Sequence, residues 1–435
     1  MKILLTMNVP YFPAHGGANN SNRLMLESLA ERGHAVRVVV PALGVPPLFT
    51  PAELVADLAR DGVALQQDGA AFVFTINAIE THAVKEASQL RGYLKQQLES
   101  FHPDVVIVST EDPSQTLLDT ALKSGARVLY MARTTSFLPF GPQAYFPSES
   151  RARLLEQVAA IVTVSDFVAQ YVEHWSGLRA HSLPISFFGK GPFPDFGNFD
   201  EGYVTLINPC AVKGIAVFLG LAKAFPNIAF AAVPTWGTTP EDRAALEALP
   251  NVTVLAPVTD VNQLYAKTRV ILVPSLWAEA KPRTVVEAML RGIPVLAADT
   301  GGIAEVADQV LPVRAIERFT EKLDHNMLPI PIVPEQNLTP WCAALERLLT
   351  DRAHYEERSH AVKKKASAYV ESLDCSPFEG FLRRMHQDPA SVSPGQIRVS
   401  ESSKAMSDSA AGIGSLSDGQ LALLLSRLKQ KKSAH

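Results

Sequence analysis

Two glutamates, Glu279 and Glu287, are separated by seven residues in a segment that could position acids for chemistry. The pattern predicts a strand at 269–275 and a helix at 282–291, with Glu279 in the loop between them and Glu287 in the helix. One rigid strand–helix unit could then present both carboxylates to a ligand. The alternative is that Glu279 is a solvated loop acid and Glu287 an ordinary helix residue.

Backbone N–H groups at two predicted helix starts could bind an anion. Pro282 is favourable in a first helical turn, which leaves the amides of Arg283 and Thr284 without helical partners. Near the N-terminus, Gly16 and Gly17 stand between the first predicted strand and helix, where paired glycines let the backbone approach a ligand closely. Packing of the turn is the alternative for the glycines. Both places suit a phosphorylated ligand.

Polar and aromatic residues follow two further predicted strands, 203–209 and 228–234. Asn208 and Lys213 come at the end of the first of these strands and just before a glycine, where a lysine could meet a diphosphate. Trp236 follows the second strand and could stack on a base or a sugar. The alternatives are a surface lysine and a tryptophan that caps the core.

The first half of the chain offers candidates for a second substrate. Glu111 follows the strand predicted at 104–110 and could contact or deprotonate an acceptor. Arg133 ends the strand predicted at 127–133 and could clamp a phosphate or an acceptor, or form a structural ion pair. The apolar, proline-rich loop after it carries Phe137 and Phe140, which could line an acceptor pocket or pack between domains.

Short runs of Val, Ile and Leu alternate with helical patterns along the chain, which predicts an α/β protein with parallel sheets covered on both faces. In the first half, strands are expected at 2–9, 35–41, 71–77, 104–110, 127–133 and 160–165, with helices that include 18–32 and 82–101. In the second half, strands are expected at 203–209, 228–234, 252–256, 269–275 and 294–299, with helices at 214–225, 240–249, 282–291 and from Gly302, and two or three more within 341–385.

This alternation indicates two doubly wound, Rossmann-like domains, at 1–188 and 203–385, whose binding crevices face each other across a cleft. The Gly- and Pro-rich stretch 189–202 reads as an exposed interdomain linker. Residues 386–435 read as a flexible tail that ends in a short amphipathic helix at 416–432.

Composition excludes several classes of function. The 40 Lys and Arg against 44 Asp and Glu give a net charge of −4, so no overall positive field attracts nucleic acid or anionic lipid. The chain has neither G-x-G-x-x-G nor a P-loop pattern, and its 11 histidines form no ligand-spaced cluster. No metal or other cofactor is therefore expected. Three distant cysteines and the lack of a 20-residue apolar run favour a cytoplasmic protein without a transmembrane segment.

The segment from Glu279 to Val295 resembles the family-four glycosyltransferases of the GT-B fold, whose E-x7-E motif is followed by E-A-x-x-x-G-x-P-V. The resemblance implies that Glu279 lies by the donor sugar and assists a retaining transfer, and that Glu287 binds the ribose of the nucleotide. The run from Gly301 to Glu305 is similar to the family's G-G-x-x-E turn, which implies that amides at Gly301 and Gly302 lie near the phosphates.

Other positions follow from the same resemblance. Lys213 matches the lysine that contacts the diphosphate, whereas Asn208 stands where the family usually has an arginine. Backbone groups around Pro257 and Val258 are expected to hold the base. Arg133 stands in a segment where the family often has a histidine near the reaction centre.

The expected function is a metal-independent, retaining glycosyltransferase that moves a sugar from a nucleotide-diphosphate sugar to a small-molecule or carrier-bound acceptor. The 416–432 segment is similar to linker helices of polyketide and nonribosomal-peptide assembly lines, which implies a natural-product pathway and an assembly-line partner. Two alternatives stay open, namely a GT-B nucleotide-sugar epimerase or hydrolase, and a catalytically silent nucleotide-sugar-binding subunit.

Overall fold

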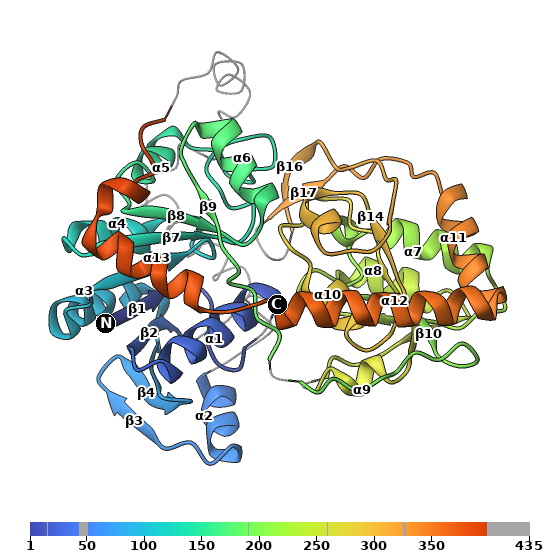
Figure 1. Cartoon of the computed structure of the whole chain (residues 1–435), viewed down its shortest axis with the longest axis horizontal. Helices are drawn as coiled ribbons and strands as arrows, with labels where there is room; N and C mark the ends of the chain where they lie inside the picture. Colours follow the sequence, from blue (N-terminus) through green and yellow to red (C-terminus); the bar gives the residue numbers. More distant parts are fainter. Residues whose placement is uncertain (15, 43–50, 190, 259, 325–327, 398–435) are drawn as a thin grey trace, which may run out of the picture.

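The computed structural model describes residues 1–14, 16–42, 51–189, 191–258, 260–324 and 328–397. The chain forms two α/β lobes that lie side by side (Figure 1), each with its own sheet and its own large hydrophobic core. The α/β class and the two Rossmann-like units predicted from the sequence are confirmed. The segment 416–432, predicted as an amphipathic helix, lies outside the described residues.

The first lobe contains a nine-stranded sheet in the order β3-β4-β5-β2-β1-β6-β7-β8-β9. All neighbouring pairs are parallel except β3–β4 and β4–β5. Its strands are β1 (Lys2–Thr6), β2 (Ala35–Pro41), β3 (Leu65–Asp68), β4 (Ala71–Ile76), β5 (Ile79–Val84), β6 (Val105–Ser109), β7 (Arg127–Ala132), β8 (Ala160–Thr163) and β9 (His181–Ser182). Its helices are α1 (Gly16–Glu31), α2 (Pro51–Arg60), α3 (Leu90–Phe101), α4 (Thr116–Lys123), α5 (Glu149–Leu154) and α6 (Asp166–Ser176).

The helix predicted at 82–101 is wrong in its first half. Strand β5 occupies Ile79–Val84, and α3 begins only at Leu90. Asn77 and Ala78 both have positive φ, so they form a tight reversal that folds β5 back onto β4. Because β5 also pairs with β2, its backbone is satisfied on both sides as a strand, and this long-range pairing overrides the helical pattern.

The second lobe contains a fully parallel sheet of six strands in the order β12-β11-β10-β13-β14-β15. These are β10 (Tyr203–Ile207), β11 (Phe230–Val233), β12 (Val252–Val254), β13 (Thr268–Val273), β14 (Val295–Ala298) and β15 (Val310–Leu311). The helices between them are α7 (Ile215–Ala224), α8 (Pro240–Glu247), α9 (Asn262–Tyr265) and α10 (Arg283–Met289). This is the strand order of a dinucleotide-binding fold. Successive strands are added on one side of β10 up to β12, and from β13 on they are added on its other side.

The segment 189–202 was predicted to be an exposed linker, but part of it packs on the second lobe. Phe193, Phe196 and Phe199 lie against the second core, and the Phe196 N–H donates a hydrogen bond to the Arg291 carbonyl oxygen at 2.8 Å. Three aromatic rings in a short Gly- and Pro-rich segment bury enough apolar surface to hold it in place. The Gly and Pro content alone did not indicate this.

Beyond β15, the chain adds the antiparallel hairpin β16 (Phe319–Leu323) and β17 (Pro329–Pro331), then α11 (Thr339–Thr350) and α12 (Arg352–Glu371) on the second lobe. The last helix, α13 (Ser376–Gln387), was predicted to belong to the second domain, but it returns to the first lobe (Figure 1). Its apolar face joins the first core through Phe378, Phe381, Leu382 and Met385. These four side chains recur at helical spacing, so one face of α13 is buried.

The expected flexible tail also begins later than predicted. Val392 is buried in the first core, and the Arg179 N–H donates to the Pro394 carbonyl oxygen at 2.8 Å. Residues 388–397 are therefore ordered against the first lobe. The chain thus crosses between the lobes twice, once near residue 190 and again between α12 and α13.

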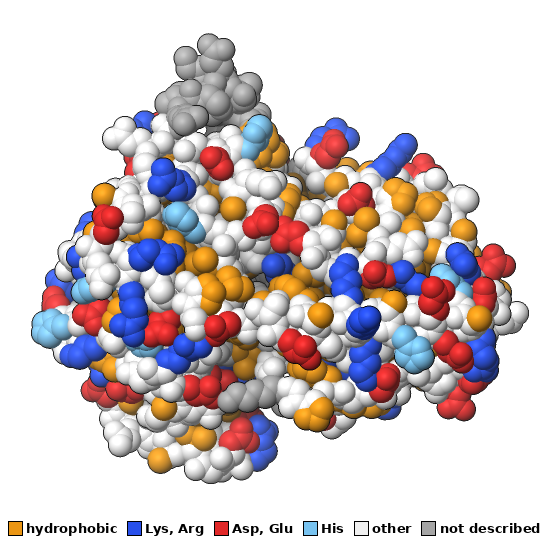
Figure 2. All heavy atoms as spheres, in the orientation of Figure 1, with side chains coloured by type: hydrophobic (Ala, Val, Ile, Leu, Met, Phe, Trp, Pro, Cys, Tyr) orange, Lys and Arg blue, Asp and Glu red, His pale blue; other side chains and the backbone are white. Residues whose placement is uncertain are grey.

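On the face that Figure 2 shows, acidic and basic side chains are interspersed over both lobes. This distribution agrees with the small net charge of −4. Positive charge can therefore act on a ligand at individual positions of the fold, and not through a broad basic surface on this face.

Candidate functional site

Several of the predicted site residues follow the strands at which the strand order of each sheet reverses. In the first lobe, Gly16 and Gly17 follow β1, and Glu111 follows the neighbouring β6. In the second lobe, Asn208 follows β10 and Glu279 follows the neighbouring β13. Ligands of open α/β sheets bind at such carboxyl ends.

The two lobes meet at these strand ends. A Cβ built on Gly17 would lie 3.2 Å from Cδ of Arg283, so the start of α1 in the first lobe directly faces the start of α10 in the second. Arg283 Nη1 donates to Ser21 Oγ on α1 at 3.2 Å and to the Phe187 carbonyl oxygen at 2.5 Å. The side chain of Arg283 therefore ties the lobes together, a role that differs from the amide donor expected of it.

Lys213 and Glu279 form the central pair of the site. Lys213 Nζ lies 2.5 Å from Glu279 Oε1, and the Ser275 hydroxyl donates to the same oxygen at 2.6 Å. Glu279 is buried, with 8% of its surface exposed, and Lys213 Nζ also lies 4.8 Å from the centre of the Trp277 ring. A cation and an anion thus share one enclosed, partly aromatic position. Ser275 and Trp277 were not predicted, although both follow β13 in the same loop as Glu279.

Backbone turns position this pair. After β10, a 3₁₀ turn at Ala211–Lys213 ends at Gly214, which has a φ of 79° and lies so close to β13 that a Cβ would be 1.9 Å from the Pro274 carbonyl oxygen. Only glycine meets both conditions without strain. Gly214 therefore brings the Lys213 turn against the segment that leads to Glu279.

The Gly301–Gly302 turn holds Glu279 from the other side. The Gly302 N–H donates to the Glu279 carbonyl oxygen at 2.7 Å, and a Cβ on Gly302 would lie 2.2 Å from the Ala280 carbonyl oxygen. The Gly302 amide was predicted to face the phosphates, but in this structure its hydrogen is used inside the protein. The turn fixes the backbone of the Glu279 loop instead.

The environment of Glu279 lowers its pKa. Burial alone would raise the pKa of this carboxyl, but the charge of Lys213 and the hydrogen bonds from Lys213 and Ser275 outweigh it. Glu279 is therefore ionised at neutral pH, and it is available as a negative charge toward a bound ligand.

This pKa shift predicts a pH dependence of stability. A carboxyl whose pKa is lower in the folded state than its usual 4.5 stabilises the fold above about pH 4.5, and the stabilisation is lost as the pH falls through the folded-state pKa. Glu279→Gln should therefore flatten the fall in the free energy of unfolding between about pH 5 and pH 3, by up to roughly 1.4 kcal/mol per pH unit. Urea unfolding at several pH values measures this, and equal slopes in both proteins would contradict it.

Asn208 lies in the same loop between β10 and α7 as Lys213 and has an unused donor. Its backbone has a φ of 60°, and its Oδ1 accepts the Gly237 N–H at 3.0 Å. Its Nδ2 is buried and has no hydrogen-bond partner among the described residues. Next to Gly237, the Trp236 ring lies 6.3 Å from that of Trp277, so Trp236 joins the same group. An amide donor without a partner in a buried position is suited to meet a ligand oxygen.

Glu287 lies one helical turn beyond Arg283. Arg283 Nη2 approaches Glu287 Oε1 at 3.1 Å, and the buried Tyr265 hydroxyl donates to Glu287 Oε2 at 3.3 Å. The Glu287 side chain keeps 21% of its surface exposed. Its partners orient it, and the exposed part can accept hydrogen bonds from a ligand. Thr284 is partly exposed at the same helix start.

Pro257 and Val258 follow the edge strand β12, and Pro257 is exposed. No contact that the structure records brings either residue to the Lys213–Glu279 pair. They share only the carboxyl edge of the sheet with it.

In the first lobe, Glu111 and Arg133 belong to one polar network. The Ser109 hydroxyl donates to Glu111 Oε2, and Arg133 Nε donates to Asn22 Oδ1 at 2.7 Å. Burial lowers the pKa of Arg133 to about 10, an effect that the charge of Glu111 opposes and that of Arg283 reinforces. Arg133 is thus a buried cation near the junction, and no carboxylate lies within ion-pair distance of it among the described side chains.

The apolar loop 134–148 reaches the second lobe through Tyr145. The Tyr145 ring packs edge-to-face on Phe319 of β16 at 5.3 Å and on Phe137 at 6.0 Å. Burial is the main reason that the pKa of Tyr145 is raised, and nearby Cys210 and Glu279 contribute. Phe137 therefore belongs to an aromatic wall beside the site. Tyr145 and Phe319 were not predicted.

Phe140, from the same loop, has a different place from the one expected. Its side chain packs against the first hydrophobic core, and its carbonyl oxygen accepts the Tyr171 hydroxyl at 3.2 Å. Phe140 therefore packs within the first lobe, and not between the domains as the packing alternative had it.

Within the described parts of the chain, no group of three or more His, Cys, Asp or Glu side chains is arranged to hold a metal ion. Among the same residues, none of the helices has the length and apolar character needed to span a membrane.

Comparison with known proteins gives matches in both lobes. Residues 15–184 match the family model described as Glycosyltransferase Family 4, and residues 203–351 match the model described as Glycosyl transferases group 1. No curated protein matches the chain.

Solved structures share the fold at low sequence identity. Sucrose-phosphate synthase from Thermosynechococcus elongatus aligns with a TM-score of 0.61 at 16% identity, over 89% of this chain and 100% of that one. HepE from Anabaena, in complex with UDP and glucose, has a TM-score of 0.59 at 14% identity, over 89% and 99%. AviGT4, a glycosyltransferase involved in avilamycin A biosynthesis, has a TM-score of 0.53 at 15% identity, over 89% and 98%. Because each lobe matches a glycosyltransferase domain and the two-lobed fold is that of these structures, the chain is a glycosyltransferase of the GT-B fold.

Proposed function

We propose that this enzyme is a metal-independent, retaining glycosyltransferase that takes a sugar from a nucleotide-diphosphate sugar and transfers it to a small, largely apolar acceptor. The donor binds the second lobe, and the acceptor binds the first. The observation that carries the proposal is the Lys213–Glu279 pair, together with the Asn208 amide in the Lys213 loop, which has no partner among the described residues. These groups offer positive and negative charge at adjacent points, as the cleavage of a sugar–phosphate bond requires.

In the proposed reaction, the bond between the anomeric carbon and the phosphate oxygen breaks, and its electron pair stays on the diphosphate. Negative charge grows on the leaving oxygen, where Lys213 and the Asn208 amide donate hydrogen bonds. Positive charge grows on the sugar, where the Glu279 carboxylate orients and stabilises it. The acceptor oxygen then bonds to the anomeric carbon on the same face, and its proton passes to the leaving phosphate.

Asn208 stands where the family usually has an arginine, so a neutral donor takes the place of a cation in this scheme. A hydrogen bond from a charged donor is roughly twice as strong as one from a neutral donor, so Lys213 carries most of the stabilisation of the leaving group. The amides at the starts of α1 and α10, including those of Gly17 and Thr284, add donors without net charge. This arrangement supplies positive character without a metal ion.

The nucleotide is assigned to the remaining groups of the second lobe. Glu287, oriented by Tyr265, accepts hydrogen bonds from the ribose hydroxyls, and Trp236 stacks on the base or sugar. Backbone groups at Pro257 and Val258 contact the base. Gly301 is assigned no contact with the donor, and it contributes through its turn, which fixes the Glu279 loop.

A panel of nucleoside diphosphates and their sugars, scored by thermal shift, tests the donor assignment. Uridine compounds come first because HepE has been crystallised with UDP and with UDP-glucose. A ligand that binds only the folded state raises its stability by mass action, by about 2.7 kcal/mol at one hundred times its Kd. We expect one base series to raise the melting temperature and Lys213→Ala to lose most of the shift. No shift with any base would overturn the proposal.

The nature of the products then separates this proposal from its alternatives. A new glycoside with the donor's anomeric configuration, measured by NMR, supports retaining transfer. Free sugar alone would indicate a hydrolase, and an isomerised nucleotide sugar would indicate an epimerase. Binding without turnover in the presence of many acceptors would indicate a silent subunit.

The acceptor is assigned to the first lobe, with Glu111 and Arg133 as its polar groups and with an aromatic wall that Phe137 and Tyr145 form together with Phe319 of the second lobe. Phe319→Ala removes an edge-to-face contact worth about 0.5 to 1.5 kcal/mol and opens the wall to water. We expect the ratio of glycoside formed to donor hydrolysed to fall several-fold, measured by chromatography of both products. Phe319→Leu keeps the apolar bulk and serves as the control. Equal ratios in all three proteins would contradict the assignment.

A natural-product acceptor, free or carrier-bound, fits the apolar wall, and AviGT4 is a structural neighbour with a role of that kind. We further propose a cytoplasmic enzyme whose segment 416–432 docks on an assembly-line partner. A chain that ends at residue 397 should then keep transfer to a free acceptor and lose affinity for the partner. Unchanged affinity would overturn the docking proposal alone.

A further inference from the structure

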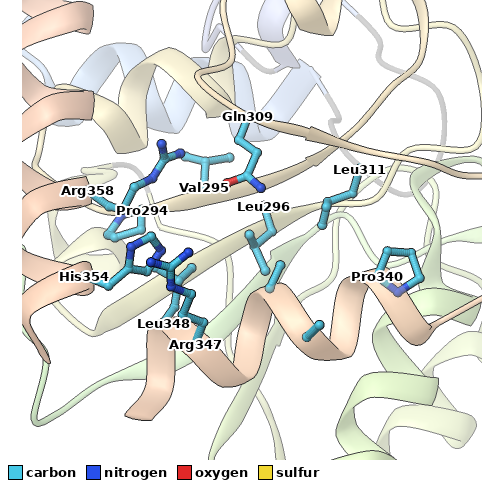
Figure 3. Close-up of a pocket in the computed structure, with 12 residues that line it drawn as sticks. Pro294, Val295, Leu296, Gln309, Leu311, Pro340, Arg347, Leu348, His354 and Arg358 are labelled. Atoms are coloured by element: carbon cyan, nitrogen blue, oxygen red, sulfur yellow. The ribbon is translucent and has the colours of Figure 1, made fainter. Parts of the chain in front are cut away.

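A cavity of about 320 Å³ lies in the second lobe (Figure 3), and neither Lys213 nor Glu279 lines it. It opens between the starts of β14 and β15 on one side and helices α11 and α12 on the other. Because the donor groups lie at the carboxyl ends of these parallel strands, this cavity occupies the opposite edge of the sheet. Its lining residues are Pro294, Val295, Leu296, Gln309, Leu311, Pro340, Ala343, Ala344, Arg347, Leu348, His354 and Arg358.

The cavity has an apolar floor and a basic end. Leu296, Leu311 and Pro340 provide apolar surface along its length. Figure 3 shows Arg347, His354 and Arg358 gathered at the end away from Pro340. This grouping follows from the chain: α11 ends at Thr350 and α12 begins at Arg352, so the corner between the helices brings the three basic side chains together.

The positive charge at this end is only partly neutralised. Arg358 pairs with Asp308, whereas no carboxylate lies within 4 Å of Arg347 among the residues that the structure places. The Asp351 side chain is engaged as the N-cap of α12, where it accepts the His354 N–H at 3.0 Å. Burial first, and then the charges of Arg347 and Arg358, lower the pKa of His354, and Asp351 and Glu357 oppose this. At neutral pH the positive charge of this end therefore comes from the two arginines, and His354 contributes a neutral ring.

We propose that this cavity is a second ligand site, which binds a small organic anion with its charged head at Arg347, His354 and Arg358 and its apolar body on Leu296, Leu311 and Pro340. Guanidinium groups bind the planar edge of a carboxylate or two phosphate oxygens with paired hydrogen bonds. The volume lies at the small end of the range for ligand pockets, so the ligand has the size of an aryl phosphate or aryl carboxylate. Uncharged analogues lack the group that the basic end holds.

Phenyl phosphate is the probe, and isothermal titration of the full chain is the measurement. The titration is made in the Lys213→Ala background, because a phosphate could also enter the donor site. We expect one saturable site that survives Lys213→Ala. Adding Arg347→Ala should weaken binding by about tenfold or more, since a hydrogen bond to a charged group is lost. Arg243→Ala, an exposed arginine on α8, is the matched control and should leave the affinity within twofold.

Further arms define the ligand class and test the place of binding. Benzoate should bind, and benzyl alcohol should not. Ala343 is exposed on α11 and lines the cavity, so Ala343→Trp should fill the space and abolish binding while the melting temperature stays near that of the parent. Absence of saturable binding, or binding that Lys213→Ala removes and Arg347→Ala leaves intact, would overturn the proposal. Neither outcome bears on the donor site, which the nucleotide panel tests separately.

Discussion

Glu279→Gln is expected to lower kcat for sugar transfer by about 10²- to 10³-fold, because a preorganised charge at the reaction centre is removed without a change in side-chain volume. Glu279 accepts hydrogen bonds from both Lys213 and Ser275 at one oxygen, so its loss also frees Lys213 from its fixed position. The measurement is kcat with the nucleotide sugar identified by the thermal-shift panel. Circular dichroism on each variant shows that the fold is retained.

Lys213→Ala and the double variant complete the comparison. When two residues act as a unit, the losses of kcat from replacing each of them do not add. The double variant should therefore have a kcat only slightly below that of the less active single variant. Lys223→Ala, an exposed lysine on α7, is the control and should keep the parent's kcat. Additive losses would mean that Lys213 and Glu279 act independently, and unchanged turnover in Glu279→Gln would place the chemistry elsewhere.

Gly214→Ala is expected to destabilise the second lobe by roughly 2 to 5 kcal/mol. A non-glycine residue at positive φ costs about 1 to 2 kcal/mol. The new Cβ would also stand 1.9 Å from the Pro274 carbonyl oxygen, and relief of such overpacking adds about 1 to 3 kcal/mol. Because the displaced turn carries Lys213, transfer activity should fall as well.

Gly33→Ala separates the two contributions. Gly33 also has a positive φ, of 84°, but a Cβ there would have no atom within 4 Å, so only the backbone cost applies. Urea unfolding of both variants measures the difference. If Gly214→Ala cost no more than Gly33→Ala, the close approach of the Lys213 turn to β13 would not constrain the site.

The positions of Glu279 and Lys213 after two strands could be predicted from the sequence because they depend on local patterns. Strand and helix periodicity placed Glu279 and Lys213 at the ends of two strands, and parallel neighbours bring such ends together. The structure has them 2.5 Å apart. The Gly302 amide was misassigned because sequence spacing does not show whether a backbone donor is already used.

The aromatic wall could not be predicted, because Tyr145 and Phe319 lie in segments without a regular pattern and far apart in the chain. Their contact depends on how the two lobes meet. The same holds for Arg283, whose partners Ser21 and Phe187 belong to the first lobe and to the crossing between the lobes. Side chains that join two domains have no local signal, because their neighbours are set by the packing of whole units.

By itself, the sequence determined the α/β class, the two repeated units and the segment that carries Glu279 and Glu287, since each follows from short-range periodicity and motif spacing. The tertiary structure alone decided that 79–84 is a strand and that α13 returns to the first lobe. In each case, burial of apolar surface or pairing with a distant strand outweighs the local preference. Long-range contacts form only after distant parts of the chain have been brought together. They therefore produce no recognisable pattern in the sequence of any one segment.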